Sequence, residues 1–309
     1  MRLNTRRRRL GKLSILLILL IVVGGLTAIA TAWRLGGQFY APNNYRVGPP
    51  PTDLGAEAVT FPSRSGAVLY GWWLPGSNSQ AGVVLMHGSG TDRRSMLERA
   101  RFLKAAGYPV LLFDFQAQGE SIGNHVTDGY LEALDARAAV EFMRQRGMEK
   151  VGIIGFSLGA AAAVLGPEGP LPADAMVLEA LYPTIEEATA DRIRLRLGDW
   201  GGWLYPLFTW QLQPRLGIAP EALRPIDRIA EVKAPILFIA GAEDRHTTLA
   251  ESERLYAKAV EPKQLWVLPD ARHGDFYEHA PDAYRQRVLD FFAGTLPQPS
   301  KQAGLGKTH

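Results

Sequence analysis

One short segment, Gly155-Phe156-Ser157-Leu158-Gly159, restricts the fold of this chain more strongly than its overall composition does. An apolar run, 151–156, leads into the serine, and four alanines follow the second glycine. The pattern predicts a buried strand, a tight turn at Ser157 and a helix packed closely behind the turn. The two glycines leave room for a strained backbone, so the turn can lift the serine hydroxyl above the edge of a sheet.

Apolar runs and helical patterns alternate on both sides of this segment. Strands that alternate with amphipathic helices form βαβ units, so the sequence predicts an α/β fold with a mostly parallel sheet between helices. Two early runs have no helix between them and are predicted to form an antiparallel hairpin at the sheet edge, at 56–61 and 68–74. The other strands are predicted at 83–86, 109–113, 151–156, 176–181, 236–240 and 264–268. The helices are predicted at 93–106, 129–146, 247–259 and 281–293.

Residues 183–224 interrupt this alternation with several large aromatic side chains among glycines and arginines. We expect a mostly helical cap inserted over one end of the sheet. Such a cap either packs as an ordinary insertion or forms a lid or an apolar substrate pocket. The whole domain is expected to span 56–296, with a disordered tail at 297–309 because that segment has little to bury.

The N-terminal 40 residues predict a membrane segment. Residues 13–33 form 21 uncharged, mostly apolar positions, enough for a helix of about 31 Å across a hydrocarbon core of about 30 Å. The basic tail before them predicts a cytoplasmic N-terminus, so the domain that follows would lie on the exported side, periplasmic or extracellular. A cleavable signal peptide with small residues at Ala28 and Ala30, and thus a secreted protein, is the alternative. The proline-rich stretch 41–55 is expected to be an extended linker.

Charge and cysteine content exclude several other functions. Residues 1–12 carry six basic side chains and no acid, so the formal charge of +3 leaves −3 on the rest of the chain. A nucleic-acid-binding domain needs a basic face, and we therefore expect no nucleic-acid partner. The chain contains no cysteine, which excludes disulfides, thiolate metal sites and a thiol nucleophile. No motif for a metal or a cofactor is found, and none is expected.

Ser157 is the predicted nucleophile, and a serine hydroxyl needs a base to remove its proton. In folds with this strand–turn–helix, the acid and then the histidine follow the serine along the chain. We therefore expect His273 to be the base, with His279 as the second choice. Asp244, which follows the strand at 236–240, is the expected acid that orients the imidazole. The alternative acids are Glu243 and Glu179.

Two backbone N–H groups are needed to bind the oxyanion that forms when the serine attacks a carbonyl. One is expected from Leu158, directly after the nucleophile. The other is expected from Ser89 in the turn His87-Gly88-Ser89-Gly90. His87 is interpreted as a residue that shapes this turn by hydrogen bonding, and not as a second base.

Over about residues 56–295 the chain resembles the α/β-hydrolase superfamily of serine hydrolases. The resemblance rests on the ordered motifs 87–90, 113–121, 155–159, 241–244 and 273–274. Within the superfamily the chain is similar to the serine aminopeptidase/monoacylglycerol-lipase type and to the prolyl-oligopeptidase-like type. Those relatives often carry Arg-Gly or His-Gly before Glu-Ser, whereas this chain has Gln118-Gly119. The resemblance implies an eight-stranded sheet, hydrolysis through an acyl-enzyme and no cofactor.

These observations predict a serine hydrolase that cleaves a small-molecule ester with an acyl, lipid-like or aryl group. A serine peptidase of the aminopeptidase or prolyl-oligopeptidase-like type is the alternative enzyme. A non-catalytic binding protein on the same fold is the alternative from another class, because a fold does not fix a function.

Overall fold

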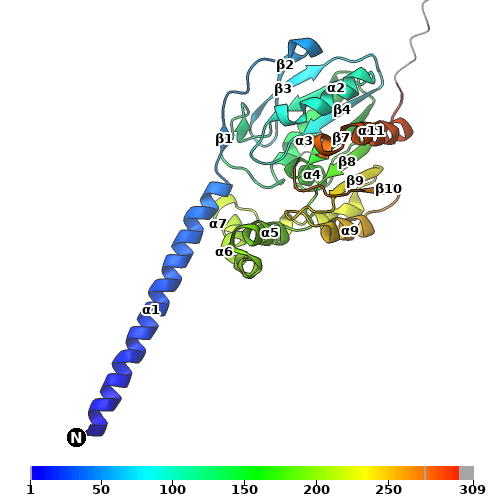
Figure 1. Ribbon diagram of the computed structural model, residues 1–309. Coiled ribbons are helices and arrows are strands. Elements are labelled where there is room, and N and C mark those ends of the chain that lie inside the picture. Colours follow the sequence, from blue (N-terminus) through cyan, green and yellow to red (C-terminus); the bar gives the residue numbers. More distant parts are fainter. Residues whose placement is uncertain (1, 275, 299–309) are drawn as a thin grey trace, which may run out of the picture.

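A computed structural model describes residues 2–274 and 276–298 of the chain. Eight strands form one twisted sheet in the order β10-β9-β8-β7-β4-β5-β3-β2 (Figure 1). Strand β3 runs opposite to the others, and it pairs with β2 in the predicted edge hairpin. The strands are β2 (Glu57–Pro62), β3 (Val68–Leu74), β4 (Ala81–Met86), β5 (Val110–Phe113), β7 (Lys150–Phe156), β8 (Ala175–Glu179), β9 (Ile236–Gly241) and β10 (Lys263–Leu268).

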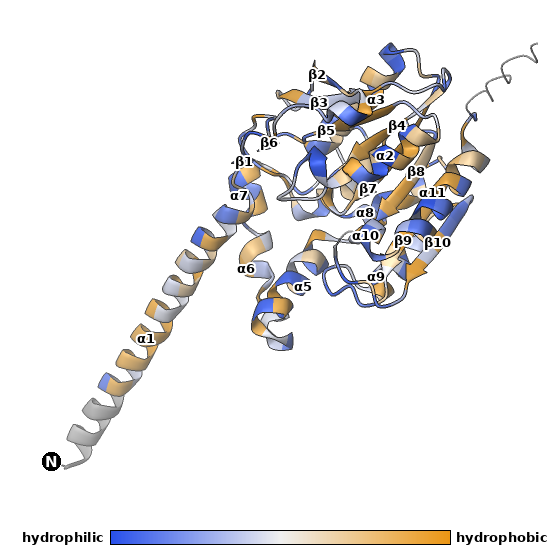
Figure 2. Ribbon diagram, turned by 45° about the horizontal axis from the view of Figure 1, so that its top comes forward, coloured by the Kyte–Doolittle hydropathy of each residue, from blue (hydrophilic) through white to orange (hydrophobic). Residues whose placement is uncertain are grey.

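Helices cover both faces of this sheet, which confirms the predicted fold class. The central strands β4, β5, β8 and β9 are buried along their whole length, and Figure 2 shows them as hydrophobic. Parallel strands covered on both faces need such continuous apolar runs. One face carries α2 (Leu97–Ala105), α10 (Phe276–His279) and α11 (Pro281–Thr295). The other face carries α3 (Glu132–Gln145), α4 (Leu158–Val164), α8 (Pro225–Arg228) and α9 (Leu249–Lys258).

Residues 183–224 form a cap of short helices at the end of the sheet where the strands β7 and β9 finish. Several of its aromatic side chains point outward, and Trp200 and Trp203 are 64% and 85% exposed. The helices of the cap are α5 (Ile185–Leu197), α6 (Pro206–Thr209) and α7 (Leu212–Leu216), with 3-10 turns at Asp199–Leu204 and Pro220–Ala222.

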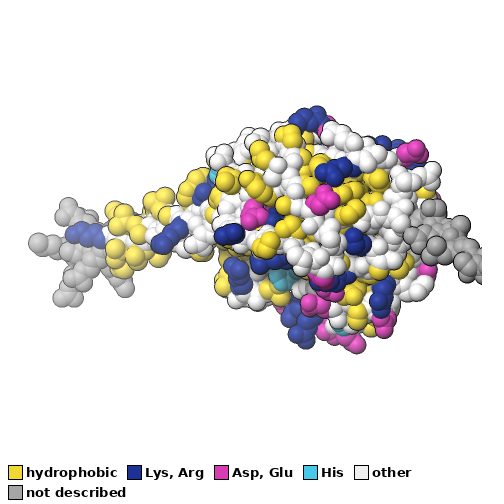
Figure 3. Space-filling view, turned by 90° about the horizontal axis from the view of Figure 1, so that it is seen from above, with side chains coloured by type: hydrophobic (Ala, Val, Ile, Leu, Met, Phe, Trp, Pro, Cys, Tyr) yellow, Lys and Arg dark blue, Asp and Glu magenta, His cyan; other side chains and the backbone are white. Residues whose placement is uncertain are grey.

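The N-terminal helix α1 (Arg2–Phe39) projects from the domain and is long and apolar enough to cross a membrane. Residues along its projecting part are largely hydrophobic (Figures 2 and 3). Its last two turns pack on the cap, where Trp33 lies against Trp210 with ring centroids 5.4 Å apart. Gln211, fully buried, donates a hydrogen bond to the Ala32 carbonyl at 3.0 Å.

The segment 41–55, expected as an extended linker, runs along the domain. Its strand β1 (Asn43–Asn44) pairs in parallel with β6 (Gln118–Gly119), and the Tyr45 hydroxyl donates to Asp92 at 2.7 Å. At the other end of the chain, most of the expected disordered tail, 299–309, lies outside the described residues.

Candidate active site

The turn after β7 gives Ser157 a backbone conformation that few non-glycine residues adopt, with a φ of 50°. A Cβ at Gly155 would lie 2.6 Å from the carbonyl of Gly159, and one at Gly159 would lie 2.7 Å from the carbonyl carbon of Met86. Both positions therefore require glycine so that α4 can pack against β4 and β7. The turn is fixed from the neighbouring strand, because the Ser157 N–H donates to the Glu179 carbonyl at 2.8 Å.

Asp244 and His273 lie next to each other beyond the ends of β9 and β10. The Nδ1 atom of His273 is 2.8 Å from Oδ2 of Asp244, and a carboxylate can only accept, so Nδ1 carries the proton. The backbone N–H groups of His246 and Thr247 donate to the other oxygen of Asp244 at 2.7 and 3.0 Å. Burial alone would raise the pKa of Asp244, but His273 and these donors together lower it below its ordinary value.

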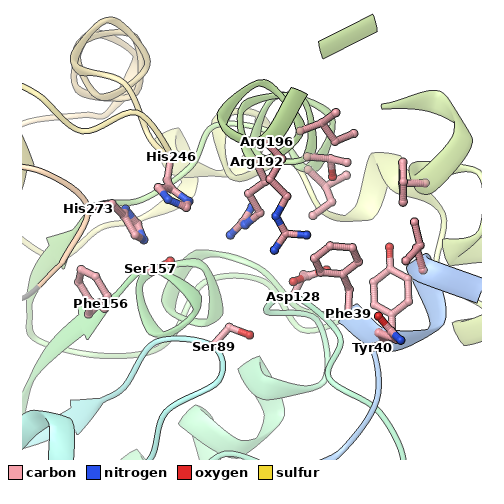
Figure 4. Close-up of a pocket in the computed structure, with 16 residues that line it drawn as sticks. Phe39, Tyr40, Ser89, Asp128, Phe156, Ser157, Arg192, Arg196, His246 and His273 are labelled. Atoms are coloured by element: carbon pink, nitrogen blue, oxygen red, sulfur yellow. The ribbon is translucent and has the colours of Figure 1, made fainter. Parts of the chain in front are cut away.

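Ser157 and His273 line one pocket of about 590 Å³ (Figure 4). With Nδ1 protonated, Nε2 of His273 is the nitrogen free to act as a base. Within the described residues no hydrogen bond joins Ser157 to His273. Such bonds are often long before a substrate closes the geometry. The pocket therefore holds a serine hydroxyl and an imidazole, and Asp244 orients that imidazole from outside the pocket lining.

Both residues predicted to bind the oxyanion belong to this site. Ser89 lines the pocket, and Leu158 is the first residue of α4. Among the described residues, no hydrogen bond occupies the backbone N–H of either residue. The turn that carries Ser89 is held by buried His87, whose Nδ1 donates to the Gly88 carbonyl at 2.8 Å and whose Nε2 accepts from the Phe115 N–H.

Burial lowers the pKa of His87 to about 4, so this imidazole stays neutral and serves the turn. Gln118 supports the same turn. At this position, two residues before the Glu-Ser pair, the hydrolases that the chain resembles often carry a charged side chain. The side-chain oxygen of Gln118 accepts a hydrogen bond from the Gly90 N–H at 2.7 Å. The neutral amide therefore stabilises the turn without adding a charge to it.

The alternative residues lie elsewhere. Glu179 is fully buried and pairs with Arg99 at 2.7 Å, and it accepts a hydrogen bond from the Tyr284 hydroxyl. Glu243 is exposed, and its side chain lies 3.7 Å from Arg272. His279 sits on α10, where its Nε2 lies 2.8 Å from the Pro269 carbonyl. In the described residues none of the three side chains forms a hydrogen bond or an ion pair with Ser157 or His273, and Glu179 meets Ser157 through its backbone carbonyl alone.

Sequence reasoning missed a second histidine and the far side of the pocket. His246 stacks on His273 with ring centroids 4.7 Å apart, and burial and the neighbouring His273 lower its pKa. Arg192 and Arg196 of α5 and Phe39 of α1 also line the pocket. The four-residue spacing of the two arginines, about one helical turn, was the available signal, but nothing local in the sequence relates α1 to the serine.

Solved structures share this architecture. A Pyrococcus furiosus esterase, Pf2001, superimposes with a TM-score of 0.68 at 25% identity, over 83% of this chain and 99% of that one. An esterase of Thermogutta terrifontis, Est2, solved with propionate bound, superimposes with a TM-score of 0.60 at 18% identity, and this likeness shows the fold alone.

Sequence comparison gives the same family. The protein named "Uncharacterized protein YfhR" of Salmonella typhimurium is 28% identical over 96% of this chain and 99% of its own length. "Uncharacterized protein Rv2307c" of Mycobacterium tuberculosis is 34% identical over 70% of this chain and 72% of its own. The sequence profile described as "Alpha/beta hydrolase family" matches residues 83–287. The chain therefore belongs to the alpha/beta hydrolase family.

Proposed function

We propose that the protein is a serine hydrolase that cleaves carboxylic esters through an acyl-enzyme. The observation that carries this proposal is the pocket that holds the strained Ser157 together with His273, itself hydrogen-bonded to Asp244. Family membership and the esterases among the similar structures support hydrolase activity.

In the proposed mechanism, Ser157 Oγ attacks the ester carbonyl carbon while Nε2 of His273 takes the hydroxyl proton. Asp244 stabilises the imidazolium that results. The N–H groups of Leu158 and Ser89 bind the oxyanion of the tetrahedral intermediate. As the intermediate collapses, His273 gives its proton to the departing alcohol. Water, activated by the same imidazole, then releases the acid and restores Ser157.

An ester substrate fits the pocket better than a peptide with a free amine. An aminopeptidase site holds the substrate's ammonium group on acidic side chains. Among the described residues that line this pocket, Asp128 carries the single carboxylate, and it faces two arginines there. The cationic surroundings disfavour an ammonium group, which supports an ester substrate.

We further propose that α1 anchors the domain in a membrane with residues 56–296 on the exported side and 183–224 as the cap. The basic residues that precede the apolar segment support this orientation. The contacts of α1 with the cap begin at Ala32, beyond the small residues Ala28 and Ala30. Cleavage after Ala30 would therefore keep these contacts and give a secreted form with the same pocket.

A fluorophosphonate probe tests the proposed chemistry on the full chain in detergent. We expect one adduct, mapped by mass spectrometry to Ser157, and no adduct in Ser157→Ala. Hydrolysis of short 4-nitrophenyl esters should fall to background in the same variant, with the thermal unfolding transition unchanged. Turnover retained by Ser157→Ala would exclude the mechanism.

A matched pair of substrates tests ester against peptide preference. The ester is 4-nitrophenyl acetate, and the amide is alanine 4-nitroanilide. Cleavage releases 4-nitrophenol from the first and 4-nitroaniline from the second, and absorbance follows both products. We expect cleavage of the ester and little of the anilide. Preferred cleavage of the anilide would replace the esterase by the peptidase, and a folded protein that neither reacts nor hydrolyses would favour a binding protein.

A further inference from the structure

Two arginines in the pocket have no part in the proposed hydrolysis. Arg192 and Arg196 are one helical turn apart on α5, and both side chains extend into the space between Ser157 and Phe39 (Figure 4). In the described part of the chain neither forms an ion pair with a carboxylate. Arg192 donates to the Ala188 carbonyl at 3.0 Å, and the Arg196 guanidinium lies over the Phe39 ring, 5.6 Å from its centroid.

Two other arginines of the cap, in contrast, form ion pairs with carboxylates. Arg194, on the same helix, pairs with Asp191 at 2.5 Å. Arg224 pairs with Asp227 at 2.7 Å. The two guanidiniums that face the pocket are therefore left with donors available, and guanidinium is the side chain best suited to bidentate binding of a phosphate.

The pocket also has one strongly apolar part, and it lies at the end of α1. Leu35 and Phe39 come from the last turns of that helix, and the cap supplies Ile185, Ile193 and Phe208. The rings of Phe39 and Phe208 meet edge to face with centroids 6.3 Å apart. An acyl chain bound here would lie next to the helix that the proposed function places in the membrane.

Other charged groups around the pocket leave it cationic. Asp128 faces the same space, where burial raises its pKa to about 6 and Arg192 acts in the opposite direction. Burial and the neighbouring His273 lower the pKa of His246, which disfavours a positive charge on this imidazole. Two guanidiniums against one carboxylate give a net positive charge outside the triad, so the pocket selects for an anion.

We propose that the substrate is an anionic membrane lipid ester whose acyl chain packs on Phe39 and Phe208 while its phosphate is held by Arg192 and Arg196. This inference rests on the proposed esterase function and adds the substrate class to it. Hydrolysis would release a fatty acid and a phosphate-bearing alcohol, with one water consumed. The end of α1 would thus form part of the binding site in addition to anchoring the domain.

The test uses two substrates with the same scissile bond, 1-octanoylglycerol and 1-octanoylglycerol 3-phosphate, in neutral detergent micelles with the full chain. We expect kcat/KM for the phosphate-bearing ester to exceed that for the neutral ester at least about tenfold, since a charged hydrogen-bonded contact contributes about this factor. In Arg192→Gln/Arg196→Gln the ratio of the two kcat/KM values should fall to within about twofold. Arg245→Gln, an exposed arginine outside the pocket lining, removes one positive charge and should keep the wild-type ratio.

Chain length separates a membrane lipid from a small phosphate ester. Butanoyl and dodecanoyl glycerol 3-phosphates carry the same phosphate, and we expect the longer one to have the lower KM. A phosphate preference without a chain-length preference would overturn the lipid assignment. Equal cleavage of neutral and phosphate esters by an enzyme that reacts normally with fluorophosphonate would overturn the inference and leave the esterase standing. Failure of the wild type to react at Ser157 or to cleave any ester would instead reject the underlying function.

Discussion

The two walls of the pocket are built in different ways. On the sheet side, Ser157 and Asp244 follow strand ends and are almost fully buried. Backbone groups fix both of them, since the Ser157 N–H donates to β8 and Asp244 accepts two N–H groups from its own loop. The sheet therefore sets the positions of these two proposed catalytic residues.

On the cap side, the pocket is lined by partly exposed side chains of α1, α5 and α6. Contacts between α1 and the cap are mostly aromatic, such as Trp33 on Trp210, or made by single side chains such as Gln211. From this contrast we infer that the residues of the sheet wall carry out the proposed hydrolysis, while those of the cap wall determine which substrate binds. Changes in the sheet wall should lower kcat for every ester, while changes in the cap wall should alter KM for some.

The largest effect is expected at the sheet wall from Asp244→Asn. An amide in place of the carboxylate can no longer hold the Nδ1–H tautomer of His273, so kcat for all esters should fall by about 10³–10⁴-fold. Steady-state assays with short and long esters measure this loss. Glu243→Gln is the matched control, since that carboxylate is exposed and makes no described contact with His273. A fall of similar size in the control, or a loss confined to long esters, would contradict the assignment.

A smaller effect, about 100-fold on the rate of fluorophosphonate labelling, is expected from Gly159→Ala. The added methyl group would press on the Met86 carbonyl and push the turn away from β4. Overpacking of this kind also lowers the free energy of unfolding by about 1–3 kcal/mol. Labelling kinetics and urea unfolding measure the two effects.

A glycine-to-alanine substitution at an exposed position is the control for Gly159→Ala. Gly294 lies in α11 with open space around its Cβ position. Gly294→Ala should keep full labelling and raise stability by about 0.5–1 kcal/mol through helix propensity. Normal labelling of Gly159→Ala would show that the turn does not depend on this close packing.

The sheet wall could be predicted from the sequence because its determinants are local. The run 151–156, the turn and the four alanines occupy consecutive positions, and similar runs located the other seven strands of the eight-stranded sheet, although not the short pair β1 and β6. The choice between Asp244 and Glu243 was harder, as both follow β9. The structure shows the physical difference, since the N–H groups of His246 and Thr247 turn Asp244 inward while Glu243 remains exposed.

The cap wall could not be predicted because it depends on contacts between distant segments. Gln211 and Ala32 are 179 positions apart, and neither position carries a motif. The sequence indicated an apolar helix and an aromatic insertion, but the contact between them depends on how the chain leaves α1 and enters β1. Arg192 and Arg196 lay inside a segment that sequence patterns described only as helical and aromatic.

An effect of about three- to tenfold is expected when the contact of α1 with the cap is disturbed. A Cβ at Gly36 would lie 2.8 Å from the side-chain Cδ of buried Gln211. Gly36→Leu should therefore separate the helix end from the cap and raise KM for long-chain esters by that factor, through lost apolar contact. Butanoyl esters have a shorter acyl chain with less apolar surface to bury, and their KM should change less than about twofold. Gly25→Leu is the control, because Gly25 lies on the same helix with open space around it. Equal effects of the two variants on KM would show that the contact between α1 and the cap does not affect the pocket.

The smallest effect separates the two walls by their dependence on pH. The pKa of Asp244 is lower in the folded protein than its ordinary value, chiefly because His273 and backbone donors outweigh its burial. Its contribution to stability is thus complete above the unfolded pKa of about 3.9 and is lost as the pH falls through the lower folded pKa. The Tm advantage of the wild type over Asp244→Asn should therefore shrink between pH 5 and pH 2.5, by about 2–4 °C for each kcal/mol lost.

Arginine does not titrate in this range, so the Tm difference between the wild type and Arg196→Gln should stay constant. Parallel curves for Asp244→Asn would show that the carboxylate is not held by His273 in solution, and a changing difference for Arg196→Gln would couple the cap wall to a carboxylate.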